Sequence, residues 1–225
     1  MPPSSPRGRF LWRGSALVLG MLLIWWFLLL NPLLYLLKGS VQFLGTVFLG
    51  GGGPESSFQV SESPAGDWSL RVPLEVQIPA SPRNPAPAMA HSVDFDIARA
   101  DATAFTFSLP VFWAIVLAAP GLRRNLRPLV VGTAVIAVIE VALLFLFVEI
   151  SAHNVAAQAT QSQNAAAGWL RHFGEYMSVS VIPYAAPFLV ALTLHGELKA
   201  LVFGWTGEKD EPAESRLKQE SKKRR

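Results

Sequence analysis

Four long apolar blocks limit what this chain can fold into. They run over residues 14–37, 102–122, 128–148 and 176–194, and Glu140 is the only charged residue inside them. A helix of about 20 residues is as long as the hydrocarbon core of a bilayer is thick. The chain is also 51% hydrophobic and only 16% charged, against about 25% charged residues in a soluble domain. We therefore expect an α-helical integral membrane protein with four transmembrane helices.

The distribution of basic residues predicts an orientation. Most of the 19 lysine and arginine residues fall in the segments 1–13, 123–127 and 195–225. Basic residues favour the cytoplasmic side, and four crossings put all three segments on one side. We expect both termini in the cytoplasm and the segments 38–101 and 149–175 outside it. Because the positive charge is then a topology signal, we expect membrane lipid and no nucleic acid as a partner.

The first external segment carries a β-strand pattern. Apolar and polar residues alternate along the whole stretch from 68 to 78, with the apolar set Trp68, Leu70, Val72, Leu74, Val76 and Ile78. Strict alternation is typical of a strand with one buried face. Shorter alternating runs at 58–60 and 93–97 predict two more strands, and Pro73 favours an edge position for the long strand. The sequence thus predicts a small antiparallel β-rich insertion between helices 1 and 2.

The apolar face of that sheet needs a cover, since so few strands cannot bury it alone. Three covers are compatible with the sequence: the chain's own helices, the lipid surface, or a partner protein. Val41, Leu44, Val47 and Phe48 recur at helical spacing, so the first helix either continues past Leu37 or lies on the membrane surface until Gly50.

The second external segment contains four ionisable residues in one layer: Glu149, His153, His172 and Glu175. They form a weak candidate for a metal or acid–base site, since no ligand spacing such as HExxH supports it. We expect no metal and no cofactor. The segment is expected to extend the third helix and to turn back through Gly168.

Glu140 lies near the middle of the third block. A carboxyl group at that depth is costly unless it is paired, hydrated or protonated. No basic residue lies at matching depth, so we expect a neutral partner from the outer halves of the other spans: Asn31, Thr106, Ser108 or Tyr184. Two interpretations stay open, a proton relay or assembly contact, and a protonated group donating one interhelical hydrogen bond.

Catalytic signatures are missing from the sequence. It has no cysteine, no GxSxG, GxGxxG or Walker motif, and no GxGD aspartate. We expect a protein that is not an enzyme. Prolines in the first and last blocks, at Asn31–Pro32 and at Pro183 and Pro187, predict points where the helices are distorted.

Three stretches carry a resemblance to a known family: NPLLYLL, FSLPVFWAIVLAAP, and RRNLRPLVVGTAVIAVIEVALLFLFVEI. With the external β-rich segment between them, this layout resembles the exosortase-associated proteins of the bacterial inner membrane, in particular those that accompany exosortase H. The resemblance implies a partner of a membrane transpeptidase-like enzyme that processes C-terminal sorting signals. Exosortases depend on a catalytic cysteine, which this chain lacks, so the resemblance implies an accessory. It carries over no site residues.

We therefore expect a non-enzymatic accessory or scaffold subunit in envelope protein sorting or surface polymer export. Its expected contact surfaces are the apolar face of residues 68–78 and the face of the third span that carries Glu140. The alternative is a subunit of a transporter or proton-coupled machine that uses Glu140. A membrane enzyme that uses the external ionisable layer is a third hypothesis. The sequence leaves a homo-oligomer open.

Overall fold

The computed structural model describes residues 6–50, 57–80, 86–119, 122–160, 164–196 and 198–199. The C-terminal segment 200–225, expected inside the cytoplasm, lies outside the described residues. The helices are α1 (Pro6–Ile24), α2 (Leu30–Phe48), α3 (Arg99–Thr106), α4 (Ser108–Ala118), α5 (Leu122–Ala159), α6 (Ala165–Tyr176) and α7 (Ile182–Leu194). Two π-helical turns, η1 (Trp25–Leu29) and η3 (Met177–Val181), join α1 to α2 and α6 to α7. The strands are β1 (Gln59–Glu62), β2 (Trp68–Ile78) and β3 (Ala88–Ile97).

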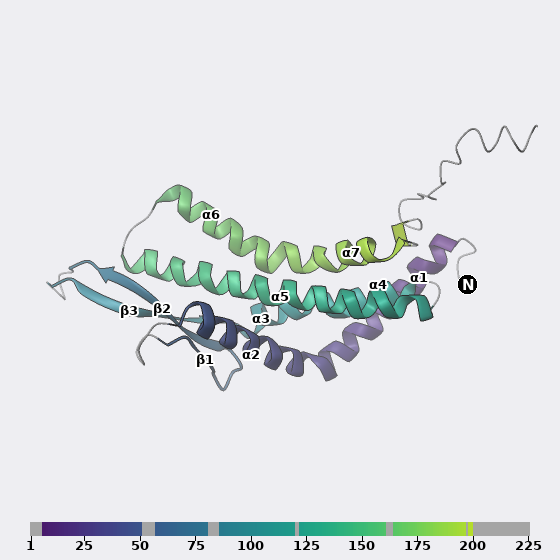
Figure 1. Cartoon of the computed structure of the whole chain (residues 1–225), viewed down its shortest axis with the longest axis horizontal. Helices are drawn as coiled ribbons and strands as arrows, with labels where there is room; N and C mark the ends of the chain where they lie inside the picture. The colour runs from purple at the N-terminus through teal and green to yellow at the C-terminus, as the bar shows by residue number, and fades with distance from the viewer. Residues whose placement is uncertain are drawn as a thin grey trace, which may run out of the picture.

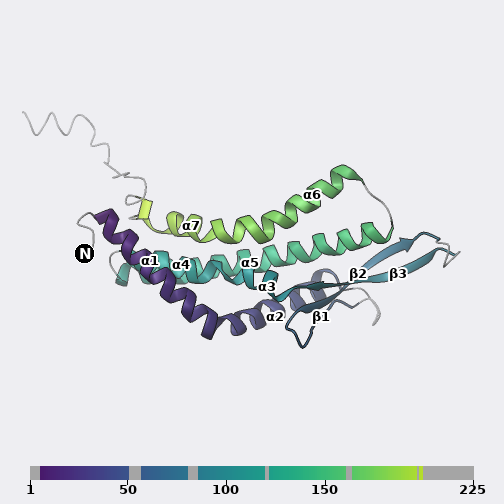
Figure 2. The ribbon, with the colours of Figure 1, turned by 180° about the vertical axis from the view of Figure 1, so that it is seen from behind.

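Four helical segments of the described chain are long and apolar enough to cross a membrane: Leu11–Phe48, Arg99–Ala118, Asn125–Ala159 and Ala165–Leu194. Each overlaps one of the four apolar blocks. α5 runs along the molecule, and the sheet lies toward one end (Figure 1). The start of α1, the end of α4 and the end of α7 gather at the opposite end, as the view from behind also shows (Figure 2). This arrangement fits the even number of crossings expected from the basic segments.

The expected distortions lie where the prolines are. η1 ends at Leu29, before Pro32, and η3 ends at Val181, before Pro183. A proline has no N–H for the regular helical ladder, and a π-turn is one way in which a helix absorbs the break. The first span bends at this point, between α1 and α2 (Figure 1).

The described strands form one antiparallel sheet in the order β1-β2-β3. The turn between β1 and β2 is closed by a hydrogen bond from the Gly66 N–H to the Ser63 carbonyl oxygen, 2.9 Å long. The prediction of an edge position for the long strand was wrong, because β2 lies in the middle. Pro73 is nevertheless tolerated there, since β1 pairs only with residues 68–71 and ends before Pro73 is reached.

The sheet is held against α2, which continues without a break past Leu37 to Phe48. The Gln42 side chain donates to the Phe58 carbonyl oxygen and accepts from the Val60 N–H, at 2.9 and 2.7 Å. The Gln42 amide thereby pairs with backbone groups at the start of β1, as a neighbouring strand would. Gly45 lets the Phe58 ring lie directly on the helix, because a Cβ atom at this position would overlap the ring.

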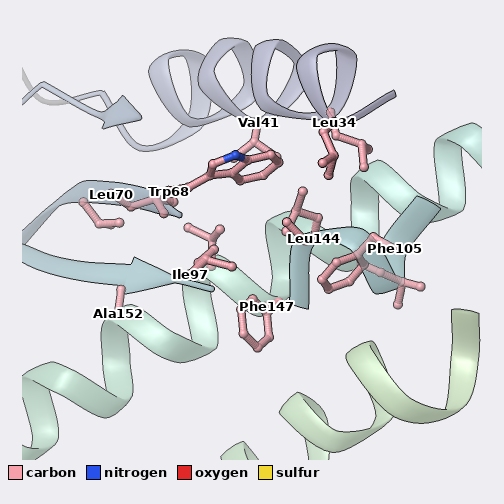
Figure 3. Close-up of a cluster of buried hydrophobic side chains, with 14 of the residues drawn as sticks. Leu34, Val41, Trp68, Leu70, Ile97, Phe105, Leu144, Phe147 and Ala152 are labelled. Carbon is pink, nitrogen blue, oxygen red and sulfur yellow. The ribbon is translucent and has the colours of Figure 1, made fainter. Parts of the chain in front are cut away.

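The main core lies where α2, α5, α3 and the inner half of the sheet meet (Figure 3). Trp68 and Val41 face each other across the gap between β2 and α2, and Leu144 of α5 lies beneath them. All three side chains are buried. The apolar face of the sheet and the outer part of the helices therefore share one core.

The connection between the last two spans differs from the prediction. α5 continues to Ala159 as expected, and α6 begins at Ala165, so that Gly168 lies inside α6 and not at a turn. The start of α6 is set by Asn164, whose side chain caps the helix by accepting from the N–H groups of Ala166 and Ala167, at 3.1 and 3.4 Å. Asparagine is among the preferred N-cap residues, and its oxygen satisfies donors that the helix leaves free.

Candidate functional site

Glu140 is buried, with 3% of its surface exposed, at the place where α5 faces α4 and α7. Ser108 is its neighbouring hydroxyl group. The Ser108 hydroxyl donates to the carbonyl oxygen of Pro183, at 2.9 Å. This carbonyl is the one that Pro187, four residues later, leaves without a helical N–H donor. One serine of the second span thus satisfies a carbonyl that a proline of the fourth span frees.

The hydrogen bond of the Ser108 hydroxyl group limits the contacts that are available to Glu140. A serine hydroxyl has one proton, and Ser108 donates it to Pro183. Ser108 is thus the hydroxyl group nearest to Glu140 among its described contacts, and its proton is directed to Pro183. The Glu140 Oε1 atom is buried without a partner, and no described ionisable side chain forms an ion pair with Glu140.

The second span is the hub of the polar contacts between helices. The Trp25 indole donates to the Thr106 hydroxyl at 3.0 Å, and the Trp113 indole donates to the Thr133 hydroxyl at 2.8 Å. With the Ser108 bond, α3 and α4 are linked to each of the other three spans. Such bonds fix the relative depth and rotation of helices in lipid, where apolar burial gives little orientation.

The other intramembrane candidates lie elsewhere. Asn31 is exposed and accepts a hydrogen bond from Arg99, at 2.7 Å. Tyr184 is 46% exposed, and its ring packs against Phe107, with 5.2 Å between ring centroids. Of the residues weighed as partners for Glu140, Ser108 lies beside it, and Asn31 and Tyr184 have other contacts.

The alternating face of β2 is divided into two parts. Trp68, Leu70 and Val72 are buried in the core shared with α2 and α5, at 1–3% exposure. Of the three covers left open by the sequence, the chain's own helices supply this one, so these three side chains offer no surface to a partner. In the outer half of the strand Val76 is also buried, Leu74 is half-buried and Ile78 is exposed.

The external ionisable layer is split between two helices. His172 lies 3.7 Å from Glu175, and Glu175 accepts from Asn154 of α5 at 3.5 Å. His153 is exposed, and its Nδ1 atom lies 2.9 Å from the backbone oxygen of Glu149 instead of approaching the α6 pair. No group of three or more His, Asp or Glu side chains in the described part of the chain could hold a metal ion.

Sequence reasoning missed two sets of hydrogen bonds, one between α5 and α6 near the external layer and one at the opposite end of α5. Arg171 donates to Asn154 at 2.8 Å and so joins α6 to α5. At the other end, Asn125 donates to the Ala119 carbonyl at 2.9 Å and lies 2.8 Å from the Nε2 atom of His195. Since the Asn125 oxygen can only accept, Nε2 carries the proton. The signal that could have indicated these contacts is the pair of asparagines in α5, whose amide groups both donate and accept hydrogen bonds.

The solvent face of the sheet is polar and hydrogen-bonded. Arg71 of β2 pairs with Asp94 of β3 through two contacts, of 2.9 and 3.2 Å. The hydrogen bond to Asp94 raises the pKa of the Arg71 guanidinium above its ordinary value. Ser69 donates to Asp96 at 2.6 Å. These residues satisfy one another, as expected of a wetted face.

The outer face of α1 is defined here as Ala16, Leu19, Gly20 and Leu23 of α1, together with Trp26 and Phe27 of the adjoining η1. All six residues are exposed, Phe27 at 76% and Trp26 at 58%. A Cβ atom at Gly20 would meet nothing within 4 Å. The first span is the least buried of the four, since only the opposite face of α1 approaches α4, where Gly14 lies close to Ala118.

These features define a membrane-associated protein with four candidate spans and a small antiparallel sheet. The chain belongs to the exosortase H-associated membrane proteins, whose family model matches residues 4–198. This confirms the family resemblance drawn from the sequence. No curated protein and no solved structure gives a match to the chain.

Proposed function

We propose that this protein is a non-enzymatic accessory subunit of an exosortase-type membrane transpeptidase, in the inner membrane and with both termini in the cytoplasm. The observation that carries the proposal is membership, over nearly the whole chain, of a family described as exosortase H-associated. Its place in envelope protein sorting follows from that association.

The outer face of α1 is our candidate for the contact with the enzyme. Ala16 and Gly20 are small residues four positions apart, a spacing that lets two membrane helices approach closely. Leu19, Leu23 and Phe27 flank them on the same face and would supply the packing.

Trp26 supports a protein contact at this face over lipid alone. Its neighbour Trp25 donates its indole N–H to Thr106, whereas the Trp26 indole N–H has no hydrogen-bond acceptor among the described residues and 58% of the side chain is exposed. An indole N–H inside the hydrocarbon region lacks water as an acceptor, so a polar group of a partner helix would stabilise it.

The second part of the proposed contact is the outer half of β2. Leu74, which is half-buried, and Ile78, which is exposed, remain available there. This patch would contact an extracytoplasmic part of the enzyme.

The test is purification of the native protein in mild detergent, with quantitative mass spectrometry of what co-elutes. We expect an exosortase at near-equal amounts. Recovery of the protein alone, from membranes in which an exosortase is detected, would refute the accessory function and leave a homo-oligomer or a self-contained role.

A further inference from the structure

A polar hollow lies where the β1–β2 turn meets α2 and the first residue of α3. Its volume is about 340 Å³, and its lining includes Asn31, Tyr35, Lys38, Glu62 and Arg99. This size is within the range of sites for small ligands. Arg99 is the first residue of the second candidate span, so the hollow lies at the sheet-side end of the spans, where lipid head groups are found.

Arg99 is held in place from three directions. Its backbone N–H donates to the Asp67 carboxylate at 2.9 Å, and its guanidinium donates to Asn31 at 2.7 Å. Its side chain also lies against Gly66, where a Cβ atom would be 2.7 Å from a guanidinium nitrogen. Gly66 has a φ of 87°, which glycine alone adopts at little cost. The arginine is therefore oriented before any ligand arrives.

The charge of Arg99 has no counter-ion within the described part of the chain. Its guanidinium makes one side-chain hydrogen bond, to the neutral amide of Asn31, and no ion pair with a described carboxylate. Lys38, in the same hollow, pairs with Glu62 at 2.9 Å. In the lining of the hollow, Lys38 and Arg99 are the two cations and Glu62 is the one carboxylate. The nearby Asp67 carboxylate accepts from the Arg99 backbone N–H and makes no ion pair with the guanidinium.

The remaining donors match a phosphate group. A guanidinium binds phosphate through two parallel N–H bonds, and an ammonium with three donors can keep one partner while it donates to another. Tyr35, which lines the hollow, is 77% exposed, and Leu36, the next residue of α2, is 64% exposed. An aromatic ring at the interface and an apolar neighbour are suited to the glycerol and acyl parts of a lipid.

We propose that this hollow binds the phosphate group of an anionic phospholipid, with Arg99 and Lys38 as its ligands and Asn31 positioning the guanidinium. The inference does not depend on the proposed partner enzyme. A bound lipid at this place would join the sheet to the membrane surface.

The experiment is a titration of the purified full-length protein in detergent with phosphatidylglycerol, followed by native mass spectrometry. We expect one tightly bound lipid. Arg99→Gln should weaken this binding about tenfold or more, as is typical of a lost charge-assisted hydrogen bond. Arg99→Lys, which keeps the charge and loses the fork, should lie between the two. Arg71→Gln, which removes an ion-paired arginine of the same sheet, is the matched control and should bind like the wild type.

Two further arms identify the source of the phosphate. Phosphatidylcholine should bind more weakly than phosphatidylglycerol, and an excess of inorganic phosphate should not displace the lipid. Displacement by inorganic phosphate would show a site for the free ion and overturn the lipid assignment. Equal losses in the Arg99 and Arg71 variants would overturn the site itself. If Arg99→Gln does not fold, wild-type binding by Arg99→Lys would overturn it as well.

Discussion

The Ser108 hydroxyl donates to the Pro183 carbonyl oxygen, 2.9 Å away, and this carbonyl is the one that Pro187 deprives of its helical donor. The second and fourth spans are thus joined at a break in the helix. The arrangement predicts that substitutions of Ser108 and Pro187, which lie far apart in the sequence, have coupled effects on the free energy of unfolding. Ser108→Ala should destabilise the protein by about 1 kcal/mol, in the range measured for hydrogen bonds between membrane helices. In a Pro187→Ala background the same substitution should cost less, because residue 187 then supplies its own N–H.

A double-mutant cycle of unfolding free energies in detergent measures this coupling. Ser180→Ala, at an exposed position of η3, is the control and should be neutral in both backgrounds. Equal costs of Ser108→Ala with and without Pro187 would show that the carbonyl is satisfied in another way.

Glu140 should behave as a hydrogen-bond donor. Glu140→Gln keeps a donor toward Ser108 and should leave assembly and function intact. Glu140→Leu removes it and should destabilise the protein by about 1 kcal/mol. Unfolding in detergent and recovery of the native complex are the two measurements. Loss of function in the Gln variant, with normal stability, would instead favour the proton-coupled alternative.

Gly45 should be the most sensitive glycine of α2. Gly45→Ala places a methyl group against the Phe58 ring and should destabilise the protein by about 1–3 kcal/mol, as overpacking does. Gly39→Ala is the matched control on the same helix, because its Cβ atom would meet nothing within 4 Å. Alanine has the higher helix propensity, so this variant should be neutral or slightly stabilised. Thermal unfolding distinguishes the two, and similar melting temperatures would contradict the close packing of the sheet on α2.

The orientation can be tested directly, because the chain contains no cysteine. Single cysteines at Met89 in β3 and at Arg127 near the start of α5 lie at exposed positions near the sheet end and the opposite end. In cells whose outer membrane is permeabilised and whose inner membrane is intact, a membrane-impermeant maleimide should label Met89→Cys. It should label Arg127→Cys only after the inner membrane is permeabilised as well. The opposite pattern would invert the topology.

The outer face of α1 should affect association and leave the isolated protein unchanged. Gly20→Leu adds a side chain where the chain itself has open space, so the melting temperature should stay the same while recovery of the enzyme falls. Ala134→Leu makes a similar change at an exposed position of α5 and should leave recovery unchanged. A loss of recovery in both variants would point to a general effect of bulk in the membrane.

Much of the fold follows from periodicity. The four apolar blocks predict the spans, and the alternation from Trp68 to Ile78 predicts β2, because each pattern is set by one side-chain repeat. The start of α6 after Asn164 was missed, because a glycine such as Gly168 is a stronger turn signal than a single asparagine. The capping role of Asn164 appears only from its hydrogen bonds in the structure. The middle position of β2 was missed because Pro73 excludes a pairing only at its own position, and β1 ends before that position.

The contacts of the candidate site depend on depth and rotation, which a sequence pattern does not supply. Glu140 was predictable as a buried polar residue with a neutral partner, and Ser108 was among four candidates for that partner. That Ser108 also serves Pro183 depends on the packing of α4 against α7. The cover of the 68–72 face by α2 likewise depends on Gln42 and Gly45, two residues whose roles appear only when the sheet lies against them.

The accessory function is tested most directly by site-specific photocrosslinking in living cells. A crosslinking amino acid at Leu23, on the outer face of α1, is compared with one at Leu189, an exposed position of α7. We predict a crosslink to the exosortase from position 23 and none from position 189. Crosslinks to lipid alone from position 23, in cells that contain the enzyme, would contradict the proposed contact between α1 and the exosortase.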